Sequence, residues 1–123
     1  MNTNDVADSI GAVLVAIHAR TTRNKSPQTP INPYVVFRLD SALPTTPSTD
    51  YYLNVDVYDA PSVSSRAIET LADTIQDELN KKLINTAAIN LYLALEQRQF
   101  ISNSDLVESQ MVNLRFVIRT YFK

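Results

Sequence analysis

The side chains that most often perform catalysis or bind metals are scarce in this chain. Its 123 residues include a single histidine, His18, a single glycine, Gly11, and no cysteine. Without cysteine there is no thiolate nucleophile and no zinc–sulfur site. A lone histidine has no second ligand or base beside it in the sequence, and such sites need convergent partners. We therefore expect no catalytic residue, no metal site, no cofactor and no enzymatic activity.

Two aspartates, Asp56 and Asp59, are the nearest approach to a catalytic pair of carboxylates. Residues three apart on a strand point to opposite faces of the sheet, so the two cannot act together on one substrate. The sequence instead predicts a solvent-facing Asp56, with Asp59 or Ser62 as the cap of a following helix.

Three acidic residues, Glu69, Asp73 and Asp77, are spaced four apart and form a negative row along one predicted helix. Like-charge pairs at this spacing cost a helix about 0.2–0.5 kcal/mol each. One interpretation is an ordinary solvated face, supported by a pair between Asp77 and Lys81. The other is the wall of a lumen along which DNA slides without binding.

Arginine and tyrosine side chains, Arg98 among them, gather on the outward positions of the predicted strands. This composition is typical of protein interfaces, although a solvated stripe without a partner is the alternative. The residues expected in an oligomer or partner interface are Arg38, Tyr58, Tyr92, Arg115, Arg119 and Tyr121.

The composition indicates a single globular domain spanning residues 1–123. Hydrophobic residues make up 45% of the chain, charged residues 20%, and the net charge is −2, which argues against nucleic-acid binding as the main role. One glycine cannot build a phosphate-binding loop. The apolar run at residues 11–17 follows Asp5 and Asp8 and is too short to span a bilayer. We expect a soluble, cytoplasmic protein with no membrane partner.

Two amphipathic helices are predicted over residues 4–19 and 62–83. In the first, apolar residues fall at i, i+4, i+7, i+8 and i+11, which is one helical face. In the second, the apolar stripe consists of Ala67, Leu71, Ile75, Leu79 and Leu83, widened by Ile68 and Ala72.

Four strands are predicted by alternation, over residues 33–40, 52–59, 89–96 and 112–119. Apolar positions are odd-numbered in the third strand and even-numbered in the fourth. A hairpin that buries one face must therefore pair residues whose numbers sum to an odd value. A register near Tyr92 opposite Arg115 meets this condition.

The remaining segments contain proline and threonine without regular apolar positions. Residues 20–32 and 41–50 are therefore predicted as long loops that are mobile in the isolated subunit. The resulting fold class is α+β, with one mixed or antiparallel four-stranded sheet packed against two helices in the order α-β-β-α-β-β. A right-handed crossover is expected if the second and third strands run parallel.

Two segments, Asn32-Pro33-Tyr34-Val35-Val36-Phe37 and Asn54-Val55-Asp56-Val57-Tyr58-Asp59, lie within this order of elements. Together with that order, they make the chain resemble the tail terminator and tail completion proteins of long-tailed bacteriophages. The resemblance runs from about residue 33 to the C-terminus.

The resemblance implies a virion protein that forms a hexameric ring at the head-proximal end of the tail tube. It would end tail growth and join the tail to the head connector, with DNA passing through its lumen without specific binding. Its partners would be further copies of itself, the tail tube protein and the head-connector or stopper protein. The subunit would be monomeric in isolation.

The residues themselves leave two alternatives open. One is another small virion part, such as a head-completion or minor tail protein. The other is a non-catalytic α+β module that binds a ligand or has a regulatory role.

Overall fold

The computed structural model describes residues 3–24, 33–45, 48–60, 65–87, 89–102 and 110–122. Its elements are α1 Thr3–Ile17, β1 Thr21–Arg23, β2 Tyr34–Thr45, β3 Ser48–Asp59, α2 Ser65–Leu79, β4 Leu83–Asn85, β5 Ile89–Ser102 and β6 Gln110–Phe122. The class is α+β with two helices, as predicted. The sheet has six strands, whereas alternation in the sequence predicts four.

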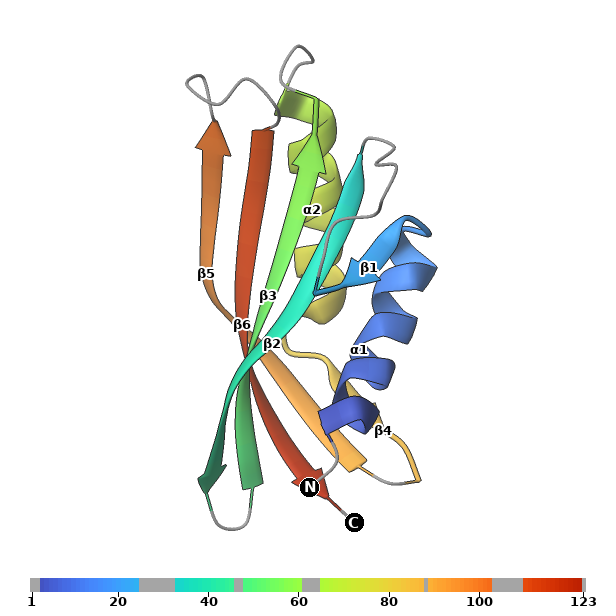
Figure 1. Ribbon diagram of the computed structural model, residues 1–123, viewed down its shortest axis with the longest axis vertical. Helices are drawn as coiled ribbons and strands as arrows, with labels where there is room; N and C mark the ends of the chain where they lie inside the picture. Colours follow the sequence, from blue (N-terminus) through green and yellow to red (C-terminus); the bar gives the residue numbers. More distant parts are fainter. Residues whose placement is uncertain are drawn as a thin grey trace.

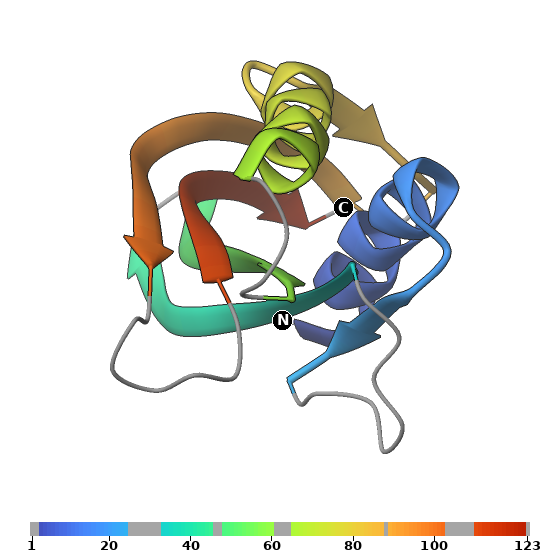
Figure 2. The ribbon, with the colours of Figure 1, turned by 90° about the horizontal axis from the view of Figure 1, so that it is seen from above.

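The strands form one mixed sheet in the order β1-β2-β3-β6-β5-β4. Of the described strands, β1 and β2 pair in parallel and every other neighbouring pair is antiparallel. β3 and β5 both run antiparallel to β6, so they run parallel to each other. The sheet twists so strongly that its strands cross in the view of Figure 1. Figure 2 shows it curling around one side of the molecule, with α1 and α2 on the other.

The buried residues lie between the sheet and the helices. α1 contributes Val6, Ile10 and Leu14, which are almost fully buried, as its periodicity predicts. The buried row of α2 consists of Ile68, Ala72, Ile75 and Leu79. Ala67 is exposed and Leu71 is only half-buried, so the stripe that faces the sheet is rotated from the predicted one.

The C-terminal end of α2 differs from the prediction. The helix ends at Leu79 rather than at Leu83, because the chain turns at Lys81, whose φ of 61° lies in the left-handed region. Leu83 then begins β4. The predicted first residues of this helix, 62–64, lie outside the described residues.

The prediction of a loop over residues 41–50 is largely wrong. β2 continues to Thr45 and β3 starts at Ser48, and the two pair as a hairpin with Thr45 opposite Ser48. Pro44 lies in this ladder opposite Thr49, which an edge strand tolerates because its missing N–H faces no neighbour. Residues 46 and 47, and residues 25–32 of the other predicted loop, lie outside the described residues.

Both edges of the sheet are only partly covered. β1, which arises within the predicted loop over residues 20–32, pairs with residues 35–37 of β2. β4 pairs with residues 90–92 of β5. Within the described part of the chain, residues 38–45 of β2 and residues 96–102 of β5 therefore have a neighbouring strand on one side only.

The hairpin of β5 and β6 has the predicted parity but a different register. Tyr92 pairs with Arg119, not with Arg115, and the odd sum holds as far as Leu95 opposite Phe116. A β-bulge then inserts Glu96, and Gln97 pairs with Arg115. Beyond this bulge the alternation of β5 is reversed relative to residue number. Even-numbered residues, which face outward in the first half, face the helices in the second.

The single glycine, Gly11, lies where α1 comes close to the sheet. A Cβ atom at this position would lie 3.2 Å from Cζ of the Phe37 ring, which is closer than the optimal separation of two carbon atoms. Phe37 is buried in the core. A larger residue at position 11 would therefore force the helix or the ring to move.

Candidate functional site

The outer face of the sheet, on the side away from the helices, carries all six residues expected in an interface. We use this name for the side chains on β2, β3, β5 and β6 that alternate with those facing the core between sheet and helices. Its members are Tyr34, Val36, Arg38, Asp40, Tyr52, Asn54, Asp56, Tyr58, Tyr92, Ala94, Asn113, Arg115, Val117, Arg119 and Tyr121. Strand pairing brings Arg38, Asn54 and Arg115 into one row across three strands.

Tyr34 and Tyr58 stack on neighbouring strands at one end of the outer face. Their ring centroids are 5.0 Å apart and the rings are inclined by 17°. Burial raises the pKa of the Tyr58 hydroxyl from its usual value of 10.0, and the negative charge of Asp56 raises it further. Tyr34 also raises this pKa, and Arg38 lowers it. The phenol is therefore held in its neutral form.

Asp56 lies near the centre of the outer face and is 6% exposed. The prediction of a solvent-facing aspartate is wrong, because large neighbouring side chains cover it. Asn113 donates a hydrogen bond of 2.6 Å to its Oδ1 atom, and Nη2 of Arg38 lies 3.8 Å from its Oδ2 atom. Asn54 donates a hydrogen bond to Asp40 beside them. The carboxylate is thus a buried structural acceptor.

Asp59 is on the opposite side of β3 from Asp56, as predicted from their spacing. Its Oδ1 atom accepts a hydrogen bond of 2.8 Å from the backbone N–H of Ala60. Gln110, its partner on β6, donates a hydrogen bond of 3.0 Å to the Ala60 carbonyl. The side chain therefore secures the turn after β3, and Ser62 lies outside the described residues.

Two arginines of β6 differ in how firmly the outer face holds them. The Arg115 guanidinium lies 4.3 Å from the centroid of the Tyr52 ring, and its Nε atom is 3.6 Å from Glu96. Arg119 is more open, with a 59% exposed side chain and its Nε atom 3.7 Å from Asp50. Both separations are long for an ion pair. Arg119 is therefore only loosely engaged within the subunit, whereas Arg115 is also held by its contact with the Tyr52 ring.

The lower end of the outer face, near the C-terminus in Figure 1, is markedly apolar. Leu83 of β4 pairs with Tyr92 of β5, and the two are 60% and 42% exposed. Tyr121 lies nearby on β6 and is 39% exposed. Beside them is a hollow of about 250 Å³ lined by Tyr92, Ala94, Val117 and Arg119, which we call the socket.

Sequence reasoning missed part of this end of the face. It placed Leu83 at the end of a helix, gave no role to Ala94, and put Val117 only on the same outward face as Arg115 and Arg119. These residues come together only through the register of β5 and β6, with Ala94 opposite Val117. Alternation showed that each points outward, but not that they are neighbours.

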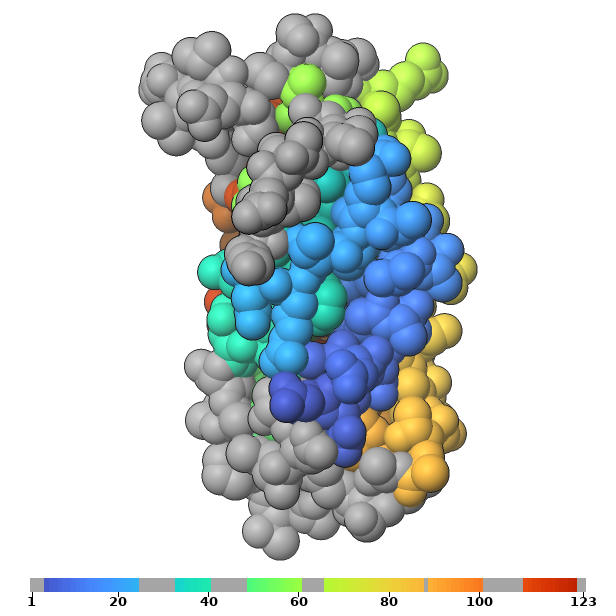
Figure 3. Space-filling model, turned by 45° about the vertical axis from the view of Figure 1, so that its right-hand side comes forward, coloured from blue at the N-terminus to red at the C-terminus, as the bar shows by residue number. Residues whose placement is uncertain are grey.

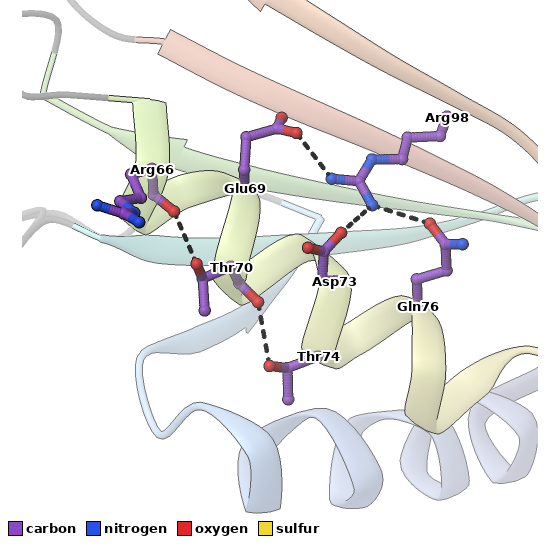
Figure 4. A network of polar contacts seen from close by, with 7 residues as sticks. All are labelled: Arg66, Glu69, Thr70, Asp73, Thr74, Gln76 and Arg98. Carbon is purple, nitrogen blue, oxygen red and sulfur yellow. Dashed lines mark hydrogen bonds and ion pairs between the residues drawn. The ribbon is translucent and has the colours of Figure 1, made fainter.

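The predicted acidic row on α2 faces an arginine that the sequence placed elsewhere. Alternation puts Arg98 on the outer face, but the bulge at Glu96 turns it toward α2 instead. Its guanidinium donates to Asp73 at 2.6 Å and to Glu69 at 3.0 Å. Gln76 accepts a third bond at 3.0 Å. Figure 4 shows this cluster, and it offsets part of the negative charge of the row, of which Asp77 remains exposed.

A groove of about 740 Å³ separates the end of α1 from the first half of α2. Its walls are mostly apolar and consist of Ile17, His18, Pro33, Arg66, Ala67, Thr70, Leu71 and Thr74. The Thr70 and Thr74 hydroxyls donate back to the helix backbone, which leaves their methyl groups for the groove. Figure 3 shows α1, in blue, at the surface on this side of the molecule.

His18 directly follows α1 and has a structural contact. Its Nε2 atom lies 2.8 Å from the Pro33 carbonyl oxygen, to which Arg20 also donates at 3.0 Å. In the described residues, no group of three or more His, Cys, Asp or Glu side chains is arranged to hold a metal ion. None of the described helices has the length and apolar character needed to cross a membrane.

The fold has a counterpart among solved structures. The chain is similar to a chain in the virion of native gene transfer agent (GTA) particle, with a TM-score of 0.66 over 89% of this chain and 85% of that one. The two sequences are 16% identical, so the similarity is one of fold. No protein-family model matches the sequence, and no curated protein sequence matches it significantly.

Proposed function

We propose that this protein is a structural subunit of a phage-like particle. The observation that carries the proposal is the fold similarity to a virion chain, which extends over 89% of the present chain. The sequence segments that resemble phage tail terminators, residues 32–37 and 54–59, include the first residues of β2 and the second half of β3. The particle itself is the expected location, with assembly in the host cytoplasm.

Within such a particle, we propose the role of a tail terminator. Copies of the chain would form a hexameric ring at the head-proximal end of the tail tube, stop its growth and join it to the head connector or stopper. The tail tube protein and the connector would then be its partners. A head-completion or minor tail protein of the same fold is the alternative within this class.

The outer face supports an assembly role because it combines exposed tyrosines with loosely engaged arginines. The side chains of Arg38 and Arg119 are 47% and 59% exposed, and Tyr92 as a whole residue is 42% exposed. Arginine and tyrosine are among the residue types enriched at energetically dominant interface positions. A neighbouring subunit with carboxylates at matching positions would pair with these arginines. The outer face is therefore our candidate for contact between subunits.

The acidic row on α2 is our candidate for a surface that faces DNA. Glu69 and Asp73 share one arginine, so the cluster with Arg98 keeps a net charge of −1. The exposed Asp77 and Glu78 extend the negative surface along the helix. Such a surface repels the phosphate backbone, which permits passage without binding. No cofactor, metal or catalytic step is part of the proposed role.

A ligand-binding module is the second candidate, and one observation favours it. The groove between α1 and α2 is large enough for a small molecule and is mostly apolar. An apolar fluorescent probe that binds this groove, with loss of binding in a Leu71→Asp variant, would support that candidate.

Deletion of the gene from a phage or gene transfer agent genome tests the terminator role. Electron micrographs should show completed heads that lack tails, with tails that are unjoined or of abnormal length. Expression of the wild-type chain in trans should restore joined particles. Normal particles from the deletion strain would contradict the proposal.

A further inference from the structure

One exposed aromatic side chain lies far from the apolar end of the outer face. Phe100 is near the end of β5 and is 43% exposed. It follows the bulge, so it belongs to the side of the sheet that faces the helices, opposite Val112. Of the exposed large apolar residues in the described part of the chain, Val15 is the only other one outside the cluster of Leu83, Tyr92 and Tyr121.

The socket has the size and the lining to hold such a ring. Its volume is about 250 Å³, and an apolar cavity of about 150 Å³ already admits benzene. Ala94 and Val117 provide an apolar floor, and Tyr92 provides an aromatic wall. The Arg119 guanidinium, which is loosely held by Asp50, can lie over the face of an inserted ring.

The two features cannot meet within one chain. Tyr92 and Phe100 are eight residues apart on the same strand, and one of these residues is taken up by the bulge. The remaining seven steps separate them by about 23 Å at the usual rise per residue. Phe100 also belongs to the opposite side of the sheet. This knob, the Phe100 side chain, and this socket can therefore meet only when one belongs to one copy of the chain and the other to a second copy.

We propose that Phe100 of one copy inserts into the socket formed by Tyr92, Ala94, Val117 and Arg119 of the next copy. The inference rests on the proposed ring and names the contact that builds it. In a ring, each copy would offer its knob to the next copy and its socket to the previous one. Such a head-to-tail contact is heterologous, and heterologous contacts generate rings when the rotation closes. The aromatic anchor in a pocket is the usual form of an energetically dominant contact.

Two variants separate the knob from the socket. Phe100→Ala removes the knob and leaves the socket intact, whereas Ala94→Phe fills the socket and leaves the knob intact. Gln99→Ala, next to the knob but on the other side of the strand, is the matched control. Thermal melts establish that each variant is folded before its association is measured.

Association is followed by native mass spectrometry and by titrating isotope-labelled chain in two-dimensional NMR, up to about 1 mM chain so that even millimolar contacts are populated. At this high concentration, wild type and Gln99→Ala should form species larger than dimers, although the dilute subunit is expected to be monomeric. Each of the two variants alone should remain monomeric. Their equimolar mixture should form heterodimers and nothing larger, with amide shifts at Ala94 and Val117 of labelled Phe100→Ala chain.

Self-association of either variant to the wild-type extent would overturn the inference. A mixture without heterodimers, or a wild-type chain that stays monomeric at about 1 mM, would also overturn it.

The result is independent of the gene deletion. If deletion disrupts particles while both variants assemble normally, the proposed function stands and this contact is wrong. If the mixture forms heterodimers while deletion leaves particles normal, the contact is real and the terminator role is wrong.

Discussion

Arg98 on β5 and Glu69 on α2 are joined by a hydrogen-bonded ion pair of 3.0 Å across 29 residues of sequence. Asp73 and Gln76 accept from the same guanidinium. The cluster fastens the helix to the half of β5 that has a strand on one side only. Its arginine side chain is 25% exposed, whereas those of Glu69 and Asp73 are 41% and 63% exposed.

Replacing Arg98 with glutamine should lower the free energy of unfolding by about 0.5–1.5 kcal/mol, because the acceptors lose a charged donor but remain partly solvated. The double variant Arg98→Gln with Glu69→Gln should be less destabilised than the sum of the single variants. Urea unfolding of the four chains gives this coupling. Additive effects would show that the pair contributes nothing.

Deleting Glu96 should leave the fold intact, since this residue is the extra one in the bulge. Its removal lets Gln97 follow Leu95 in an uninterrupted ladder, and every side chain keeps its face. Deleting Ala94 is the control, because it turns Leu95 outward and Glu96 inward. Melting temperatures should therefore fall much further for the Ala94 deletion. Equal losses would contradict the assigned bulge.

Substituting leucine for Gly11 should destabilise the protein by about 1–3 kcal/mol, the usual cost of overpacking. The new side chain would collide with the buried Phe37 ring. Ala12→Leu places the same side chain on the exposed neighbouring position and should change stability by less than about 0.5 kcal/mol. Denaturant unfolding of both variants distinguishes a local clash from a general effect of added bulk.

Truncating Phe116 to alanine should cost about 3–5 kcal/mol, because this fully buried ring of β6 leaves a cavity. Arg119→Ala, on the outer face of the same strand, should change stability by less than about 0.5 kcal/mol but prevent assembly. Thermal melts combined with sedimentation of assembled complexes measure both effects. Normal assembly of the arginine variant would place the subunit contact on another face.

Raising the pH should weaken the folded state through Tyr58. Its folded pKa lies above the unfolded value of 10.0, so the folded state holds the phenolic proton more tightly. The resulting stabilisation is complete below the unfolded pKa and is lost as the pH rises through the folded pKa. Urea unfolding between about pH 9 and pH 11 should show this loss, and Tyr58→Phe should remove it. An unchanged slope in that variant would assign the loss to other groups.

Most of the architecture could be predicted from the sequence because long elements repeat their periodicity many times. The two helices and the four long strands follow from such repeats, and so does the outward direction of Arg38 and Tyr92. β1 and β4 contain three residues each, too few for a pattern. Pro44 led to the prediction of a loop where the structure has a paired edge strand. Proline lacks the backbone N–H donor, but its strand can still pair with the neighbour on the other side.

Two errors at the candidate sites come from how neighbouring strands pair. A bulge reverses the alternation without changing the composition of the strand, so the sequence alone places Arg98 on the wrong face. Which residues are neighbours in the socket likewise depends on the register of β5 and β6. A shift of this register by four residues would bury the same face equally well, so alternation alone does not select the register. Contacts between strands were therefore harder to predict than the direction of each side chain.

The uncovered edge of β5 also bears on how the separate subunit avoids forming fibrils. Open strand edges are templates on which further strands add without limit, and natural proteins oppose this with bulges and with charges that point inward. Residues 96–102 have both, in the extra Glu96 and in the inward guanidinium of Arg98. An added strand would meet a bent ladder and a charge already committed to the helix. The subunit can thus keep an edge open while its growth into a cross-β stack is blocked.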